Sequence, residues 1–514
     1  MEIVLRSNVT VIDPPGWLLH WMKITYTMEN PAYFDRKSRN IPVYGTSKRL
    51  CLFTFDNTTN TLSFGRGMLY DVINKIKDRG VDYTFIDDRS QGHYLDAEFT
   101  GTLEDFQVPA VDALTKRDFG ILCSPAGSGK TVMGLNLIAK LKTTTLWLTH
   151  TTDLLRQTKL RAEQFLKGIG RVGTLHGHSK ELGSGGVIVA NVKTVKNFDE
   201  EFFTTLCQLI GMIIVDEAHH TPSDVFSDIL VRAPVKRVYG LTATPDRADG
   251  LSFLMESTIG KVAYTVNRDV LYKTNKLVIP ELKVIDTDFM YKGTDSDEES
   301  SVDAGGEEFD YHRLLDELVE DEARRKLILD NISHMHSKSG MYQIILADRK
   351  EYLFKLAEEL PKLLTRPAVI EVVHSGLSKK VRIDIMERLC NKQIDVIFAT
   401  QLAREGLDVP HLNVMHLVWP RKGDSKRTRE DGSVEFRQGC ALEQEIGRIM
   451  RPVPGESKKA YLFDYVDADN GVLVRQYYTR RKVYERLKIK APRRAVRQKK
   501  LVEVEKFLRS TNIF

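Results

Sequence analysis

The chain lacks the cysteine pairs, histidine clusters and long apolar runs that mark several common classes of protein. Its 514 residues include five cysteines, which lie far apart without the spacing of a zinc site or a redox pair. We therefore expect reduced thiols, with Cys123 and Cys207 in the core. No apolar run approaches the roughly 20 residues that span a bilayer, and residues 1–6 lack the pattern of a secretory signal. These absences predict a cytoplasmic protein.

The small net charge of +5 conceals two charged blocks. Residues 295–322 are strongly acidic, and residues 475–500 contain many lysines and arginines interleaved with Tyr477, Tyr478 and Tyr484. Blocks of one sign are typical of solvated segments. The tyrosines leave a second interpretation open for the basic block, which is contact with a phosphate backbone.

The most informative stretch is residues 124–131, SPAGSGKT. It lies between an apolar run, residues 119–123, and a helical pattern, residues 131–141, as a phosphate-binding loop requires. Such a loop directs backbone N–H groups and the positive end of a helix toward phosphate oxygens. The site residues that we predict here are Gly127, Ser128, Gly129, Lys130 for the phosphates and Thr131 for magnesium.

A second motif follows, residues 216–219, DEAH. The apolar run 209–215 predicts a buried strand that delivers Asp216 and Glu217 at its carboxyl end, where parallel sheets bind ligands. Together with the phosphate loop, this pair predicts an ATPase in which Asp216 holds Mg²⁺ and Glu217 orients the attacking water.

The chain divides into segments of different composition. We expect a small α+β domain over 1–98, an α/β motor domain over 99–270, and a linker with the acidic segment over 271–310. A second α/β domain follows over 311–470, and a basic helical extension over 471–514. The fold class is therefore α/β, with two tandem doubly wound parallel sheets. The first domain could bind DNA, contact a partner or brace the motor.

The second α/β domain carries residues 444–451, QEIGRIMR. A helix through this stretch would place Gln444, Arg448 and Arg451 on one face. Two guanidinium groups that point the same way can stabilise the charge that develops during phosphoryl transfer.

These motifs, with residues 241–245 (LTATP) and 399–410 (ATQLAREGLDVP), resemble the DEAH-box type of superfamily 2 helicases. Within that superfamily, residues 216–220 and 241–250 look most like the group of phage UvsW-type recombination helicases and XPB-type repair helicases. The resemblance implies two RecA-like domains, ATP and Mg²⁺ as cofactors, and forked or branched DNA as the partner. It also suggests a phage or bacterial origin, with the host cytoplasm as the location if a phage encodes the chain. The sequence leaves the oligomeric state open, and we favour a monomer.

The resemblance assigns further roles by position. Gln107 matches the glutamine that reads adenine, and Gly406 and Asp408 match contacts to the nucleotide. The residues that it implies for coupling ATP to nucleic acid are His219, Thr242 and Thr244. Strand contacts would come from Thr149, His150, Thr151, Thr194, His374, Ser375 and Thr400, each of which could equally be a capping residue.

A polar insert, residues 421–439, separates Trp419-Pro420 from the helix with the two arginines. Asp431-Gly432 is a hairpin-turn signal. Some related helicases hold a strand-separating wedge here, so a wedge and a plain surface loop are both open interpretations. The insert supplies the remaining nucleic-acid candidates, Arg421, Lys422, Lys426 and Arg427.

Three functions fit these observations. The first is an ATP-dependent helicase or translocase that unwinds or branch-migrates DNA in replication, recombination or repair. The second is an RNA helicase or a duplex translocase that does not unwind. The third, from another class, is a scaffold that clamps ATP and nucleic acid without hydrolysis; the intact Glu217 and Arg448 argue against it.

Overall fold

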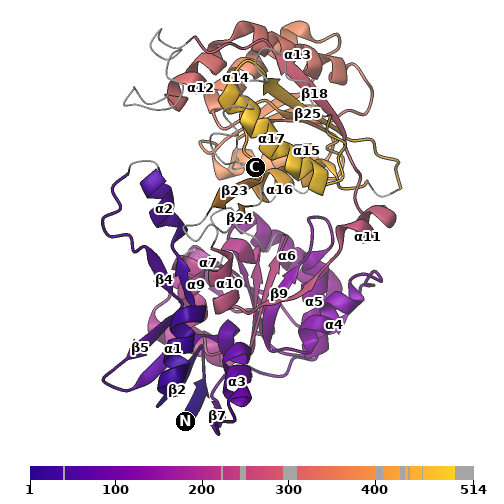
Figure 1. The fold of residues 1–514 in the computed structure, drawn as a ribbon. Helices are drawn as coiled ribbons and strands as arrows, with labels where there is room; N and C mark the ends of the chain where they lie inside the picture. The colour runs from indigo at the N-terminus through magenta and orange to yellow at the C-terminus, as the bar shows by residue number, and fades with distance from the viewer. Residues whose placement is uncertain are drawn as a thin grey trace, which may run out of the picture. The chain divides into compact units, whose positions relative to one another are not determined.

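The structure is a computed structural model. It describes residues 1–38, 41–220, 224–243, 251–292, 310–400, 409–428, 434–437, 440–453 and 455–492. The chain forms two compact units, Met1–Leu271 and Tyr272–Phe514 (Figure 1). Within the described residues, no helix is long and apolar enough to cross a membrane.

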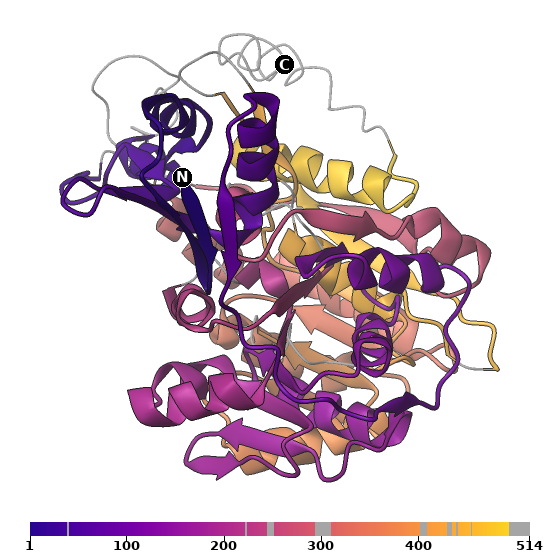
Figure 2. The same ribbon diagram turned by 90° about the horizontal axis from the view of Figure 1, so that it is seen from below.

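The first unit begins with a small sheet of strand order β5-β6-β2-β1-β7. Half-buried and buried residues alternate along β1 and β2, so one face of this sheet is buried. Two helices, α1 and α3, accompany it, and α2 extends from a short β3-β4 ladder (Figures 1 and 2). The bounds are β1 Glu2–Leu5, β2 Asn8–Ile12, α1 Gly16–Thr25, β3 Thr27–Glu29, α2 Pro31–Ser38, β4 Arg49–Cys51, β5 Phe53–Asp56, β6 Thr61–Gly65, η1 Arg66–Met68, α3 Leu69–Asp78 and β7 Thr84–Asp87.

The larger sheet of the first unit has the order β13-β12-β14-β10-β15-β16-β9-β17. Its central strands are parallel and completely buried, as expected of apolar runs covered by helices on both faces. Its strands are β9 Phe119–Cys123, β10 Thr145–Thr149, β12 Gly173–His176, β13 Ser179–Glu181, β14 Val187–Asn191, β15 Met212–Asp216, β16 Arg237–Thr242 and β17 Val262–Thr265; β8 Glu98–Phe99 pairs with β11 Leu166–Lys167. The helices are α4 Val108–Thr115, α5 Lys130–Leu141, α6 Thr152–Phe165, α7 Val192–Lys196, α8 Glu200–Leu209, η2 Ala218–His220, α9 Asp224–Arg232, α10 Ser252–Thr258 and α11 Arg268–Lys273.

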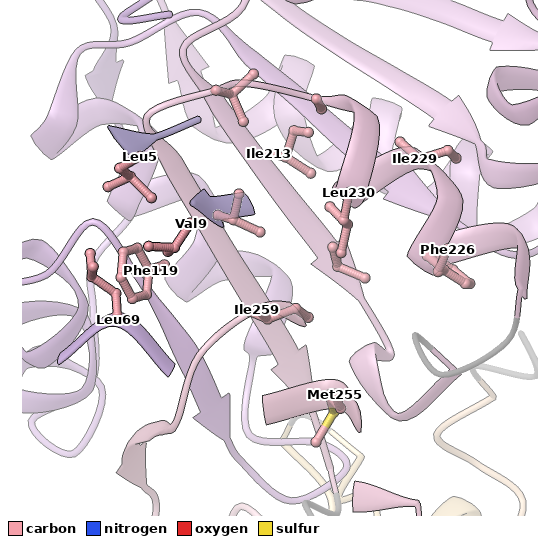
Figure 3. Close-up of a cluster of buried hydrophobic side chains, with 14 of the residues drawn as sticks. Leu5, Val9, Leu69, Phe119, Ile213, Phe226, Ile229, Leu230, Met255 and Ile259 are labelled. Carbon is pink, nitrogen blue, oxygen red and sulfur yellow. The ribbon is translucent and has the colours of Figure 1, made fainter. Parts of the chain in front are cut away.

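The two sheets of the first unit share one hydrophobic core. Leu5, Val9 and Leu69 from the small sheet and its helix lie in the same cluster as Phe119 and Ile259 from the larger domain (Figure 3). Cys207 belongs to this cluster, and Cys123 is also buried, as the sequence predicts. The small sheet is thus built into the first unit as part of its interior.

The second unit contains a parallel sheet of order β18-β25-β22-β19-β21-β20. Two doubly wound α/β domains, the fold class predicted from the sequence, are therefore confirmed. The bounds are β18 Glu281–Thr287, α12 Tyr311–Glu320, α13 Glu322–His336, β19 Gln343–Leu346, α14 Lys350–Glu359, η3 Leu360–Leu363, β20 Ile370–Val373, α15 Lys379–Cys390, β21 Val396–Ala399, β22 Val414–Leu417, β23 Ser425–Thr428, β24 Val434–Arg437, α16 Cys440–Ile449, β25 Tyr461–Asp467 and α17 Gly471–Arg486.

The start of the basic C-terminal block is part of the core of the second unit. Tyr477 and Tyr484 are fully buried on α17. Arg480 donates two hydrogen bonds to the carboxylate of Asp464 on β25, at 2.8 and 3.0 Å. The sequence-based interpretations of a solvated or phosphate-binding surface are wrong for these residues, because Asp464, a buried acid on the strand that precedes α17, neutralises the arginine.

Candidate nucleotide-binding site

Three neighbouring strands of the first unit end at one edge of the large sheet. They are β15, β16 and β9, which are parallel and adjacent, so their carboxyl ends meet. The phosphate loop follows β9, the acid pair ends β15, and Thr242 ends β16. This topology brings together three motifs that are spread along the sequence from residue 124 to residue 242.

The phosphate loop is shaped by two glycines in the left-handed region. Gly127 and Gly129 both have φ of 82°, a conformation that L side chains rarely adopt. The loop leads into α5, which begins at Lys130 with no side-chain cap and no acidic residue in its first turn. An uncapped helix start that follows a glycine loop is suited to bind anionic oxygens.

Gln107 holds this loop from the side. Its amide nitrogen donates to the carbonyl oxygen of Ser128 at 2.7 Å, and its amide oxygen accepts from the backbone N–H of Glu104 at 3.0 Å. A side chain at Gly129 would collide with the Gln107 amide, since a Cβ there would lie 2.5 Å from its nitrogen. The structure therefore gives Gln107 a role in shaping the loop, beside the adenine contact predicted for it.

The acid pair lies next to the loop lysine. The Lys130 ammonium is 3.7 Å from a Glu217 carboxylate oxygen and 3.4 Å from the carbonyl oxygen of Ser124. Burial, and then the neighbouring Glu217, raise the pKa of Asp216 to about 6, while Lys130 opposes the shift. Glu217 has a positive φ of 49°, a strained conformation for a residue with a side chain. A buried acid next to an acid with a strained backbone is typical of a functional site.

His219 links the acid motif to the coupling motif. Its Nδ1 lies 3.1 Å from the hydroxyl of Thr242 and 3.5 Å from Glu217. The backbone of the same threonine accepts from the N–H of Ser124 at 2.8 Å, so β16 is bonded to the phosphate loop as well. His219 and Thr242 are thus in contact beside the phosphate loop, and their coupling role stays a prediction.

One residue of this site carries no sequence signal. Arg161 on α6 donates to the hydroxyl of Thr131, with 3.4 Å between the two heavy atoms. Burial lowers the pKa of Arg161, and the nearby Asp216 works against this shift. Its guanidinium adds positive charge beside the predicted magnesium ligand. Only folding brings α6 to the loop, so an arginine in a mixed polar helix gave no indication of this contact.

The residues present fit a magnesium nucleotide. The loop backbone and Lys130 suit phosphate oxygens, and the hydroxyl of Thr131 with the buried carboxylate of Asp216 offers the oxygen ligands that Mg²⁺ prefers. A bound cation also stabilises an acid whose ionised form is disfavoured by burial and by a second carboxylate.

The arginine motif of the second unit lies on α16 and the turn that follows it. Gln444 and Arg448 are on the helix, and Arg448 is buried. The helix ends at Ile449, so Arg451 does not share its face as the sequence predicted. Pro452 explains the difference, because the residue before a proline is disfavoured in the helical conformation. Lys458 fixes the turn by donating to the carbonyl oxygens of Arg451 and Pro410, at 2.7 and 2.6 Å.

The predicted strand-contact residues have different surroundings. Thr149 is buried and donates to a backbone carbonyl, and Thr151 caps α6 by accepting from Leu154 N–H. Thr194 accepts from the N–H of Gly177. In the second unit, Thr400 is largely buried; His374 accepts from the N–H of Gly376, and Ser375 is exposed. The capping alternative holds for Thr151, while His150 is half-buried beside it.

The insert after Trp419 begins with a buried ion pair. Arg421 is 7% exposed, bonds to the carboxylate of Asp348 and lies 3.7 Å from Glu445. This burial contradicts its prediction as a nucleic-acid contact, because two acids hold its guanidinium inside the second unit. Lys422 is exposed, and β23 pairs with β24 as an antiparallel hairpin that includes Lys426 and Arg427. The predictions for Thr244, Gly406, Asp408 and the turn at Asp431-Gly432 lie outside the described residues.

Two parts of the chain match known protein families. Residues 74–247 match the family described as "Type III restriction enzyme, res subunit", and residues 323–453 match "Helicase conserved C-terminal domain". One relative is "Putative helicase 22" of Sulfolobus islandicus filamentous virus, 26% identical over 365 residues, covering 68% of this chain and 60% of the relative. Another is "DNA 3'-5' translocase XPB2" of Sulfurisphaera tokodaii, 28% identical over 386 residues, covering 71% and 81%. Among solved structures, the DUF1998 helicase MrfA bound to DNA has a TM-score of 0.53 at 14% identity, covering 74% of this chain and 51% of that one.

A phosphate loop with an acid pair on one parallel sheet, and a helicase C-terminal sequence on a second, define the ATP-dependent helicases. The chain belongs to superfamily 2 of these enzymes and is similar to its XPB-like and viral members. The DEAH-box subgroup does not follow from these matches and stays a prediction.

Proposed function

We propose that this helicase acts on DNA, translocating along it and unwinding or migrating forked and branched substrates in replication, recombination or repair. The observation that carries the motor function is the contact of the acid motif and the coupling threonine with one phosphate loop. Support for DNA comes from relatives named DNA 3'-5' translocase and DNA 3'-5' helicase.

In this proposal, Lys130 and the loop N–H groups bind the phosphates of ATP, and Thr131 with Asp216 holds the Mg²⁺. The metal would neutralise phosphate charge. Glu217, strained at its backbone and 3.7 Å from Lys130, orients the attacking water. Hydrolysis would alter the contacts of His219 with Glu217 and Thr242, and β16 would carry the change along the sheet.

The second unit would contribute Gln444, Arg448 and Arg451 to the same reaction. Their guanidinium groups would stabilise the charge of the phosphoryl transition state. Since such groups act only when the two units close on the nucleotide, a cycle of closing and opening would convert chemistry into movement along the strand. The cofactors of this reaction are ATP and Mg²⁺.

RNA is the alternative substrate, because one relative is named "Putative ATP-dependent RNA helicase L396", at 24% identity over 406 residues. Phosphate release measured with single-stranded DNA, forks, four-way junctions and RNA hybrids separates the two. We expect the largest stimulation with forked or branched DNA. Stimulation by RNA alone would replace DNA with RNA in this proposal.

The catalytic assignment is tested with Lys130→Ala and Glu217→Gln in the same assay. Each should reduce the DNA-stimulated rate by about 100-fold or more, since one removes phosphate charge stabilisation and the other removes water orientation. Lys140→Ala is the matched control: this lysine is on the same helix but forms an exposed pair with Asp112. Near-normal turnover in either site variant would refute the assignment, and a wild-type protein that binds ATP without hydrolysis would indicate the scaffold.

A further inference from the structure

The loop of residues 65–67 contains a fully buried arginine directed at backbone carbonyls. Arg66 Nε donates to the carbonyl of Ser7 at 3.0 Å. Its Nη1 donates to Val235 at 3.1 Å, and its Nη2 donates to Leu230 and Ala233 at 3.1 and 2.9 Å. One of these four hydrogen bonds stays within the small sheet, at Ser7, and the other three join it to the end of α9 and the turn after it.

The charge of Arg66 is balanced by these carbonyls, since it forms no ion pair with any carboxylate among the described residues. Two of the carbonyls lie at the C-terminal end of α9, where the helix dipole favours a cation. Burial and the proximity of Arg89 lower the pKa of Arg66 to about 9, so the side chain stays cationic at neutral pH. Burying a cation costs free energy, because water solvates it better than an apolar core does. The hydrogen bonds to the carbonyls must therefore offset this cost at Arg66.

The same turn, residues 233–236, is held by two more residues that precede the phosphate loop. Arg89 donates to the carbonyl of Lys236 at 2.7 Å. The backbone of Ser90 makes two hydrogen bonds to the turn. Its N–H donates to the carbonyl oxygen of Pro234 at 2.6 Å, and its carbonyl oxygen accepts from the N–H of Lys236 at 2.8 Å. The position of the turn is thus set largely by the N-terminal part of the chain.

The glycines on either side of Arg66 touch α10. A Cβ at Gly65 would lie 2.1 Å from the carbonyl oxygen of Ser257, and one at Gly67 would lie 1.8 Å from that of Glu256. Contact this close excludes any side chain at either position. The loop is therefore wedged between the end of α9 and the end of α10.

Both helices belong to segments that follow nucleotide-sensing motifs. The acid motif at Asp216 and Glu217 continues through η2 toward α9, and β16 runs from the turn to Thr242 at the site. Helix α10 is the first described element after Thr242. A shift of Thr242 can therefore reach the turn that Arg66 holds through β16, a single regular strand.

We propose that Arg66 is a positioning residue for the motor: with Gly65 and Gly67 it holds α9, β16 and α10 in the register that keeps His219 and Thr242 against the phosphate loop when nucleic acid stimulates hydrolysis. This inference rests on the proposed function. It gives the N-terminal sheet a part in coupling, through contacts remote from both ATP and DNA.

The test compares Arg66→Met and Arg66→Lys with wild type in the full chain. Measured are the basal ATPase rate, the rate with saturating forked DNA, the KM for ATP and the melting temperature. Methionine fills the space without hydrogen bonds, and lysine restores the charge but not the planar fork that reaches four carbonyls. Leu18→Ala is the control, because it truncates a buried residue of α1 and leaves the bonds of the turn intact.

We expect Arg66→Met to reduce the ratio of DNA-stimulated to basal rate by about tenfold, with the KM for ATP within about twofold of wild type. The ratio for Arg66→Lys should lie between those of Arg66→Met and wild type. Leu18→Ala should lower the melting temperature and keep the ratio. An unchanged ratio in Arg66→Met, or an equal loss in Leu18→Ala, would show that Arg66 only stabilises the fold and would overturn the proposal.

If Arg66→Met does not yield folded protein, Arg89→Lys gives the same test more gently. It removes the bond to Lys236 and preserves a cation beside Asp87 and Asp118. A reduced ratio at an unchanged KM supports the inference, and an unchanged ratio refutes it. A wild-type protein without nucleic-acid stimulation would instead refute the proposed function, so the two failures are distinguishable.

Discussion

At the scale of single residues, the phosphate loop depends on a glycine for two separate reasons. Gly129 has a left-handed φ and faces the Gln107 amide, so Gly129→Ala would add both backbone strain and a collision. We expect the KM for ATP to rise by about tenfold or more, because the displaced loop no longer directs its N–H groups at the phosphates.

Gly80→Ala is the control that adds backbone strain without a collision. Gly80 is also left-handed, with φ of 63°, but nothing lies near its added Cβ. This control should lower stability by about 1 to 2 kcal/mol and leave the KM for ATP unchanged. Equal KM values for the two variants, obtained by steady-state ATPase kinetics, would contradict the role of the Gln107 contact.

Lys458 predicts a pH dependence of stability. Burial, with Arg451 nearby, lowers the pKa of Lys458 to about 7, whereas an unfolded lysine titrates near 10.4. Between these values the unfolded chain binds more protons, so stability rises with pH and is lost as pH falls toward 7. Lys458→Met should remove about 1 to 2 kcal/mol of the gain between pH 7 and 9. Chemical unfolding of both proteins at the two pH values measures it, and identical slopes would exclude this contribution.

Residues that act through neighbours in sequence were predictable, and those that act through distant partners were not. The glycines, Lys130 and the acid pair have roles that local spacing defines. Arg421 and Arg480 look like surface cations in the sequence. In the fold both are buried, and they form ion pairs with Asp348 and Asp464. Arg66 and Arg161 gave no signal at all, since their partners are carbonyls and a hydroxyl that only the tertiary fold supplies.

At the scale of elements, the hairpin β23-β24 can be removed without disturbing its anchor. Gly423 and Asp424 donate backbone N–H bonds to Thr479 of α17, and Asp424 pairs with Arg486. The paired strands begin only at Ser425 and end at Arg437. A deletion of 425–437, bridged by a short glycine-serine linker, therefore leaves the second unit intact.

We expect this deletion to abolish strand displacement on a forked duplex and to keep DNA-stimulated ATP hydrolysis, as a strand-separating wedge requires. A second variant that replaces 425–437 by glycine and serine of equal length tests whether the paired strands, rather than the added chain, matter. Unwinding at the wild-type rate in both variants would dismiss the wedge and favour a plain surface loop.

The sequence predicted strands better than helix ends. The apolar run 119–123 has the bounds of β9, and the run 209–215 with its predicted end at Asp216 covers β15, because buried parallel strands read as continuous apolar segments. The helix through the arginine motif was extended too far, since spacing alone ignored the effect of Pro452 on Arg451.

At the scale of the whole molecule, the N-terminal sheet and the first α/β domain should fold together. Their apolar side chains form one cluster, and Arg66 bonds across the boundary. Removal of residues 1–87 would expose the Phe119 and Ile259 side of that cluster to water. We expect the truncated chain to be insoluble or rapidly digested by protease, which limited proteolysis of the two proteins would show. A truncated chain with wild-type protection would contradict a joint core.

The core that the N-terminal sheet shares with the first α/β domain also has a consequence for evolution. A segment joined to its neighbour by a linker can be exchanged between genes as a cassette, but one that completes its neighbour's interior must change in step with it. Paired substitutions across this boundary, rather than recombination at it, are therefore the route by which the N-terminal sheet can diversify.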